Sequence, residues 1–136
     1  MKRIFGVLLL VGPGGFSGQG GLDVAAQRAR QAWLAHDPVA LFQGSPGVIL
    51  QIPGADPSAA MGRAQAGELL ARYLRTSVER GVDIAVAREV EDGRGYVELV
   101  RRYTIVGTTE ERRETVFMGL RRQGDRWAVV ELRAGP

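Results

Sequence analysis

The hydrophobic period of this chain changes near Gly81, and this change limits the folds that the chain can adopt. Before Gly81, apolar residues recur every three or four positions, which is the spacing of amphipathic helices. After it, Val82, Ile84 and Val86 alternate with aspartate and alanine, which is the two-residue repeat of a half-buried strand. The sequence therefore predicts helices before Gly81 and a sheet after it.

Three further strands are predicted at hairpin spacing, over roughly 94–106, 110–122 and 126–133. Short turn sequences separate them, so consecutive strands must be antiparallel neighbours. Strands of this length need a bent sheet, and we expect the bend at Gly119.

The first half of the chain is predicted to hold two long helices with smaller elements between them. The first helix should begin at Leu22 and carry one apolar stripe as far as Trp33. A short helix follows, with Asp37 as its N-cap and Pro38 in its first turn.

A strand over 48–52 and a second long helix complete the first half. This helix should begin near Ala66, end near Gly81 and place Leu70 on its apolar face. The expected fold is α+β: a curved antiparallel sheet forming a cone, with N-terminal helices packed on it. The expected order is helix, short helix, strand, long helix and four strands.

The N-terminus has the features of a secretory signal peptide. Two basic residues precede an apolar run over 4–11 that is too short to span a bilayer, and Gly18 and Gly20 follow where a signal peptidase requires small residues. We expect removal of residues 1–20, one mature domain over 21–136, no transmembrane anchor after cleavage, and a periplasmic or secreted protein. An uncleaved membrane-proximal anchor and a cytoplasmic first strand are the alternatives.

The glycine-rich stretch over 12–15 is expected to break any helix, and it also imitates a phosphate-binding loop. It lacks the Gly-Lys-Ser/Thr sequence that supplies a cation to the phosphates, so we expect no nucleotide. The chain has no cysteine and one histidine, His36, which excludes cysteine-ligated metals and histidine clusters. We therefore expect no metal or cofactor, and for His36 a solvent-exposed or capping role.

The charge of the mature domain gives little attraction for nucleic acid. Removal of Lys2 and Arg3 leaves 16 of the 18 basic residues against 15 acidic ones. Three arginine doublets follow in the sheet, at 101–102, 112–113 and 121–122. Adjacent strand residues point to opposite faces, so each doublet is split and no one-sided basic stripe is expected.

The order of elements resembles the nuclear transport factor 2-like (cystatin-like cone) superfamily, and particularly its exported bacterial branches without assigned activity. The stretches that carry this resemblance are 32–42, the strand end at 52–54 and the closing 116–133. Catalytic members of this superfamily place an acid or base, often with a tyrosine, inside the cone. The resemblance makes the following residues candidates for that role: Tyr73, Tyr103, Glu98, Glu114 and Glu131.

A simpler interpretation of the glutamates is that they form cross-strand ion pairs with arginine on the solvated face. We therefore expect a non-catalytic domain that binds a small apolar ligand in the cone or forms a homodimer through its outer sheet face. A cofactor-free isomerase or lyase is the alternative. Residues expected to line the ligand pocket are Trp33, Phe42, Tyr73, Tyr103, Met118 and Trp127.

Overall fold

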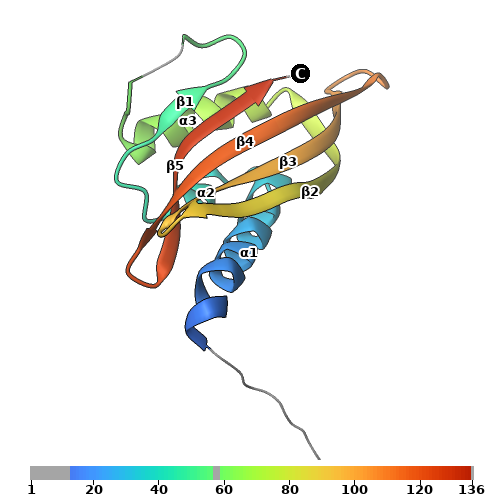
Figure 1. Ribbon diagram of the computed structural model, residues 1–136. Coiled ribbons are helices and arrows are strands. Elements are labelled where there is room, and N and C mark those ends of the chain that lie inside the picture. Colours follow the sequence, from blue (N-terminus) through green and yellow to red (C-terminus); the bar gives the residue numbers. More distant parts are fainter. Residues whose placement is uncertain (1–12, 57–58, 136) are drawn as a thin grey trace, which may run out of the picture.

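The computed structural model describes residues 13–56 and 59–135, and these form three helices and five strands in the predicted order (Figure 1). The bounds are α1 Pro13–Leu34, α2 Pro38–Leu41, β1 Ile49–Gln51, α3 Arg63–Leu74, β2 Ser77–Glu91, β3 Arg94–Ile105, β4 Glu111–Gln123 and β5 Arg126–Gly135. The predicted α+β fold class is confirmed.

The five strands form one sheet in the order β1-β5-β4-β3-β2. Strands β2 to β5 pair antiparallel with their chain neighbours, as predicted. Strand β1 instead pairs in parallel with β5, with Ile49 opposite Glu131. The sheet is therefore mixed, whereas a purely antiparallel sheet was expected. A parallel neighbour requires a long crossover connection, and here α3 and three strands provide it.

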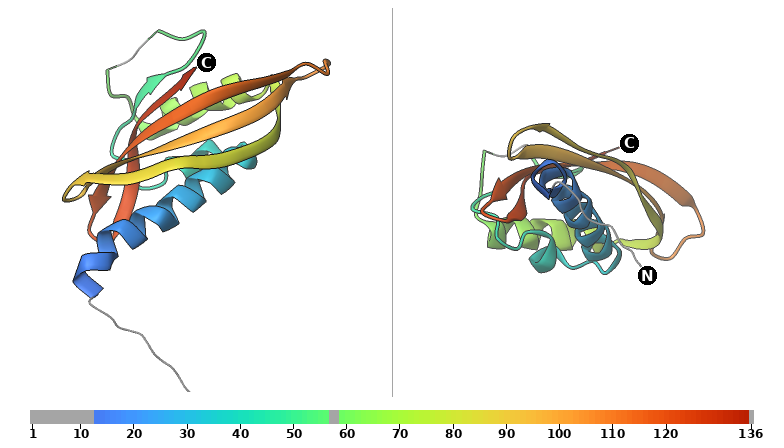
Figure 2. Two further views of the ribbon diagram at one scale, coloured as in Figure 1. Left: turned by 45° about the vertical axis from the view of Figure 1, so that its right-hand side comes forward. Right: turned by 60° about the horizontal axis from the view of Figure 1, so that its bottom comes forward.

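The sheet is strongly curved, and its register explains where it bends (Figure 2). Between β2 and β3 the register shifts at Glu79/Gly81, Ile84/Val86 and Glu89/Glu91. Between β4 and β5 it shifts at Gly119/Leu120, which is the predicted position of a bend. Such bulges bend a strand and increase its twist, so they turn the sheet into an open cone.

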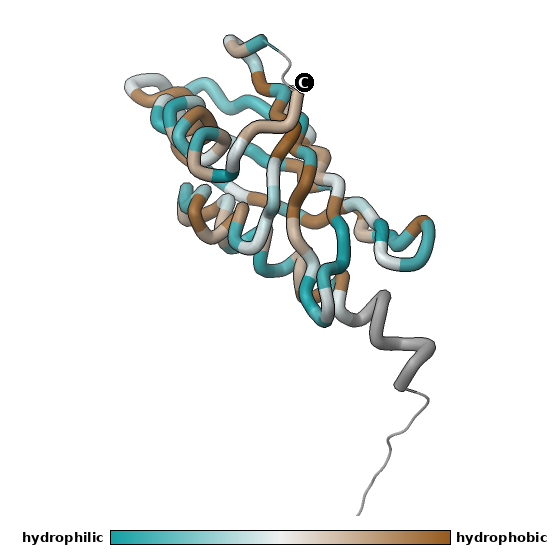
Figure 3. Tube along the Cα trace, turned by 90° about the vertical axis from the view of Figure 1, so that its left-hand side faces the viewer, coloured by the Kyte–Doolittle hydropathy of each residue, from teal (hydrophilic) through white to brown (hydrophobic). Residues whose placement is uncertain are grey.

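The helices lie on the concave side of the sheet, and the right-hand view of Figure 2 shows α1 beneath the curved strands. Helix α1 packs mainly against β2. Its predicted apolar stripe is confirmed, because Leu22 and Trp33 are fully buried together with three alanines between them. In Figure 3 hydrophobic residues (brown) recur along the strands in the middle of the molecule. The core lies between α1, α3 and the sheet.

Helix α1 begins earlier than predicted, at Pro13 instead of Leu22. Residues 13–15 of the glycine-rich stretch lie within the helix, and a proline in the first helical turn sacrifices no useful hydrogen-bond donor. The first residues of α1 project beyond the sheet (Figure 1). Residues 1–12 of the predicted signal peptide lie outside the described part of the chain. Among the described helices, none is long and apolar enough to cross a membrane.

Helix α3 ends at Leu74, several residues before the predicted end near Gly81. The hydroxyl of Ser77 donates to the carbonyl of Leu74 at 3.1 Å, and β2 begins at Ser77 itself. Serine and threonine side chains compete for backbone groups in this way and favour helix ends. As a result Glu79, which was expected in a helix, lies on strand β2, and its side chain points into the interior of the cone.

Candidate functional site

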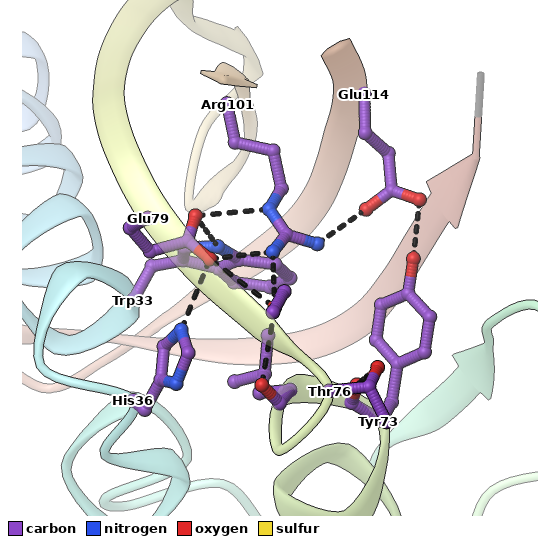
Figure 4. Close-up of polar contacts among 9 residues, drawn as sticks. Trp33, His36, Tyr73, Thr76, Glu79, Arg101 and Glu114 are labelled. Atoms are coloured by element: carbon purple, nitrogen blue, oxygen red, sulfur yellow. Dashed lines mark hydrogen bonds and ion pairs between the residues drawn. The ribbon is translucent and has the colours of Figure 1, made fainter. Parts of the chain in front are cut away.

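The cone contains a buried ionic cluster centred on Arg101 of β3 (Figure 4). The Arg101 side chain is 1% exposed, and those of Glu79 on β2 and Glu114 on β4 are each 4% exposed. We call these three residues, together with Trp33, His36, Tyr73 and Ser77, the Arg101 cluster. Burial of such charges is costly unless they are paired and hydrogen-bonded, so the contacts of each need a full account.

The guanidinium of Arg101 is held by hydrogen bonds on three sides. Its Nε donates to Glu79 Oε1 at 2.9 Å, and its Nη1 donates to Glu114 Oε1 at 2.9 Å. Its Nη2 donates to the Ser77 hydroxyl at 2.7 Å and to Glu79 Oε2. Burial by itself lowers the pKa of Arg101, but the hydrogen bonds and charges of Glu79 and Glu114 outweigh this effect and raise it. Arg101 is therefore a fixed cation inside the cone.

Aromatic rings surround the same guanidinium. The Cζ atom of Arg101 lies 3.8 Å from the ring centroid of Tyr103, 5.2 Å from that of Trp33 and 5.9 Å from that of Tyr73. These distances are within the range of cation–π attraction. The ring faces that could attract a cationic ligand are thus already in contact with a cation of the protein.

Glu79 receives hydrogen bonds from helix α1 as well as from Arg101. Trp33 Nε1 donates to Glu79 Oε1 at 3.1 Å, and His36 Nε2 lies 3.0 Å from Glu79 Oε2. An ionised carboxylate only accepts, so with Glu79 ionised the Nε2 atom of His36 carries the proton. These contacts attach the C-terminal end of α1 to the start of β2.

His36 reaches Glu79 because of its backbone conformation. It has a φ of 52°, which is the left-handed conformation found just after many helices. The His36 amide donates to the Trp33 carbonyl, and the Asp37 amide donates to the Ala32 carbonyl, both at 2.9 Å. Asp37 then caps α2 through the amide of Ala40, as predicted. The expected capping role of His36 thus holds for its backbone, whereas its ring is 28% exposed and belongs to the Arg101 cluster.

Glu114 connects the cluster to helix α3. One of its oxygens accepts from Arg101, and the other accepts a short hydrogen bond from the Tyr73 hydroxyl. Burial, followed by this hydrogen bond to Glu114, raises the pKa of Tyr73 well above that of an ordinary tyrosine. Tyr73 therefore keeps its proton, and both oxygens of Glu114 are engaged.

A cavity of about 310 Å³ opens beside the Arg101 cluster at the wide end of the cone. It lies between the end of α3 and the adjoining ends of β3 and β4. The residues that line it are Pro53, Tyr73, Thr76, Ser77, Arg101, Tyr103, Ile105, Arg112 and Glu114. Its volume is within the range of small-molecule sites, about 300–1,000 Å³.

Tyr103 lines this cavity, and its ring lies against Arg101. The residue is 9% exposed, and its hydroxyl forms no hydrogen bond with any residue in the described part of the chain. The hydroxyl is therefore available to a bound molecule.

The predicted pocket residues do not all meet at this cavity. Tyr73 and Tyr103 line it, and Trp33 contacts the Arg101 cluster from helix α1. Phe42 and Met118 are fully buried in the core and do not line this cavity. Trp127 lies near the start of the core segment of α1, beside Gly21 and Arg122.

The predicted glutamates also divide between two environments. Glu131 forms a partly exposed ion pair with Arg133 at 3.1 Å. Glu98 lies on the outer face of the sheet, whereas its neighbours Val97 and Leu99 are buried on the inner face. For Glu114 the expectation of a solvated surface pair is wrong. It stands opposite Arg101 in the register of β3 and β4, and both side chains point into the cone. The interior of the cone thus combines an apolar core with a buried ionic cluster.

Two other expectations concern metals and arginines. Among the described residues, no group of three or more histidine, aspartate or glutamate side chains is placed to hold a metal ion. The 101–102 doublet is split as predicted, with Arg101 buried and Arg102 exposed. Arg112 and Arg113 are both exposed at the start of β4, and of the two only Arg112 lines the cavity.

The sequence matches no protein-family profile, and no curated protein matches it. Solved structures, in contrast, resemble it over most of its length. A ketosteroid isomerase-like protein from Erwinia carotovora atroseptica has a TM-score of 0.72 at 16% identity, and the match covers 87% of this chain and 97% of that chain. A protein of ketosteroid isomerase-like fold from Catenulispora acidiphila, in complex with trimethylamine, has a TM-score of 0.58 at 21% identity, covering 82% and 84%.

A third similar structure is a domain of unknown function with a cystatin-like fold from Nostoc punctiforme. It has a TM-score of 0.61 at 12% identity, and the match covers 87% of this chain and 76% of that chain. Identities this low show the fold alone. The chain has the cone-shaped fold of the nuclear transport factor 2-like superfamily.

Proposed function

We propose that this domain binds a small, largely apolar molecule in the cavity beside the Arg101 cluster. The observation that carries the proposal is Tyr103, which lines a cavity of ligand size and whose hydroxyl has no hydrogen-bond partner among the described residues. A hydrogen bond from this hydroxyl to an oxygen of a bound molecule would contribute about 0.5–1.5 kcal/mol.

The walls of the cavity support a ligand with an apolar body. Pro53, Ile105 and the rings of Tyr73 and Tyr103 provide apolar surface. The polar groups lie beside this surface, and most of them already bond one another within the Arg101 cluster. Such a site suits a compact molecule with few polar atoms.

The contacts of the carboxylates favour binding over catalysis. An isomerase or lyase needs a base that is free to accept a proton from its substrate. Both oxygens of Glu114 already accept hydrogen bonds, from Arg101 and Tyr73, and both oxygens of Glu79 are also engaged. The Catenulispora protein is in complex with trimethylamine. We do not propose an amine for this chain, because Arg101 already lies against the ring of Tyr103, which an organic cation would otherwise contact.

Ligand-observed NMR with a mixture of small aromatic ketones, alcohols and acids tests the proposal. Ile105→Trp places a large ring in the cavity and should abolish binding. Val106→Trp is the matched control, because Val106 is the next residue, is 58% exposed and does not line the cavity. Tyr103→Phe removes only the hydroxyl and should weaken binding of oxygen-bearing probes.

Circular dichroism must show that both tryptophan variants remain folded. Equal binding by Ile105→Trp and the parent protein would place the ligand elsewhere and refute the proposal. Turnover of a bound ketone that Glu114→Gln abolishes would favour the isomerase or lyase alternative.

We also propose that the mature domain is exported and that it forms a homodimer. Export is supported by the signal-peptide features of residues 1–20. Dimerisation is supported by the outer sheet face, where Tyr96 and Phe117 stack at 5.8 Å in a groove that also carries Arg121 and Glu131. A surface with both charges can pair with its own copy about a twofold axis. Sedimentation analysis tests this, because Phe117→Asp should give a monomer.

A further inference from the structure

We propose that the ligand of this cavity is a small organic acid, whose carboxylate binds Arg112 at the rim while its apolar body lies against Tyr73, Tyr103 and Ile105. This inference rests on the proposed function and adds the chemical class of the ligand. Three observations support it. The Nη donors of Arg112 are free, the oxygens of the buried carboxylates are engaged by hydrogen bonds within the Arg101 cluster, and the guanidinium of Arg101 already lies against the aromatic rings.

Arg112 is the charged side chain at the cavity whose donors remain available. It is 51% exposed, and its Nε donates to Glu110 at 3.3 Å in a pair that is itself exposed. Neither Nη nitrogen of Arg112 forms a hydrogen bond with the described residues. Exposed pairs of this kind contribute little, so a ligand can replace or join Glu110. The planar pair of Nη donors matches the two oxygens of a carboxylate.

The buried glutamates do not prevent an anion from binding at the rim. Glu114 accepts from Arg101 and from Tyr73, and Glu79, which does not line the cavity, accepts from Arg101 and Trp33 and contacts His36. Arg101 is the cation that both glutamates share, and the oxygens of both are engaged by hydrogen bonds within the Arg101 cluster. Of the charged residues that line the cavity, Arg101 and Arg112 are positive and Glu114 is negative.

The same site disfavours an organic ammonium ion. The ring of Tyr103 already contacts Arg101 at 3.8 Å, and Arg101 also lies near the rings of Trp33 and Tyr73. A second cation would compete with Arg101 for these faces. The Tyr103 hydroxyl adds a donor inside the cavity, so a second acceptor oxygen on the ligand has a partner as well.

Matched sets of probes test the class of ligand by isothermal titration calorimetry. Each set contains an acid, its amide and its amine: benzoate, benzamide and benzylamine, and the corresponding cyclohexane and hexane compounds. We expect the best acid to bind about tenfold more tightly than its amide, which corresponds to about 1.4 kcal/mol, since a carboxylate can pair with both Nη donors of Arg112. The amine should not bind measurably.

Two arginine variants show whether Arg112 is responsible. Arg112→Gln should remove the preference for the acid over the amide, and Arg112→Lys should retain part of it. Arg113→Gln is the control, because Arg113 is the next residue, is also exposed and does not line the cavity. It should leave the preference unchanged.

The possible failures are distinguishable. If amides bind as tightly as acids and Ile105→Trp abolishes both, the inference about the acid is wrong while the proposed function stands. A preference for acids that Arg112→Gln and Arg113→Gln reduce equally also overturns the inference. If no probe of any set binds, both the inference and the proposed function fail.

Discussion

Arg101 is the residue on which the interior charges depend, because it contacts both buried carboxylates. Removal of one member of a buried ion cluster leaves the others uncompensated in a medium of low polarity. Replacement of all members by neutral groups of similar size removes that penalty. The stability of single and combined variants therefore separates the cost of an unpaired charge from the loss of packing.

We expect Arg101→Met to lower the free energy of unfolding by about 3–5 kcal/mol, because Glu79 and Glu114 then lose their shared cation. Adding Glu79→Gln and Glu114→Gln to this variant should recover part of the loss. Urea denaturation measures both. Arg102→Met is the control on the outer face, with an expected change within about 0.5 kcal/mol. Similar losses for Arg101→Met and Arg102→Met would contradict the assigned burial.

Tyr73 makes stability sensitive to alkaline pH. Its pKa is raised in the folded protein, whereas in the unfolded chain it titrates near the ordinary value of about 10. The corresponding stabilisation is fully present below about pH 10 and is lost as the pH rises from there through the folded pKa. We expect the tyrosinate absorbance of one of the three tyrosines to appear only with unfolding.

Tyr73→Phe tests this assignment, because it should remove the late-titrating tyrosine and reduce the alkaline loss of stability. At neutral pH the same variant should lose about 1.5–3 kcal/mol at most, since Glu114 then lacks one donor. If all three tyrosines of the folded parent protein titrate together near pH 10, Tyr73 is not held by Glu114 as described.

At the scale of elements, helix α1 lies so close to the sheet that one position has no space for a side chain. A Cβ atom at Gly95 of β3 would lie 2.9 Å from the Arg88 carbonyl oxygen and 3.0 Å from Leu22 Cδ2. The first contact is with backbone of β2, which cannot move without disturbing the sheet. A side chain at position 95 would therefore disturb both the pairing of β2 with β3 and the packing of α1 on the sheet.

Gly95→Ala should lower the free energy of unfolding by about 1–3 kcal/mol, the cost of overpacking a well-packed interior. Gly135→Ala is the matched control in β5, because its Cβ would meet no atom within 4 Å. That variant should stay within about 0.5 kcal/mol of the parent. Thermal unfolding followed by circular dichroism compares the two. Equal midpoints for both variants would mean that α1 is not packed over Gly95.

Most of the strands could be predicted because their two-residue alternation is preserved in the fold. The start of β2 could not, because its inward residues Ser77 and Glu79 are polar while Val78 between them is 41% exposed. This inverts the usual pattern. The register shift between Glu79 and Gly81 then changes the phase of the alternation, so Val82 also faces inward. The sequence pattern therefore predicts that the helix continues across this segment.

The candidate site could be predicted only in part, for a related reason. Tyr73 and Tyr103 were candidates because catalytic members of the superfamily that the sequence resembles place a tyrosine inside the cone. Glu114 was assigned to the solvated face because arginine is frequent on these strands. Which arginine faces it depends on the register of β3 against β4, and that register places Arg101 opposite Glu114 inside the cone. Residue types alone do not determine this pairing.

For the whole molecule, the packing of α1 limits where the proposed signal peptide can be cleaved without loss of core residues. Leu22 is fully buried, whereas the first residues of α1 project beyond the sheet (Figure 1). We expect cleavage close to Gly20, because removal of Leu22 would open the core. Intact-mass analysis of protein from the cell envelope or medium measures the cleavage site. Leu9→Arg, which disrupts the apolar run, should block export. Recovery of the full-length chain in the cytoplasm would contradict the proposal.

The parallel pairing of β1 with β5 affects the order in which the sheet can form. The hairpins of β2 to β5 join neighbours in the chain, but the only strand paired with β1 among the described residues is the last one. Contacts between distant segments form slowly, since a long loop must close first. Strand β1 therefore joins late, after the C-terminal strand has found β4. A nascent chain that still lacks β5 would leave β1 unpaired, with its backbone groups open to other chains.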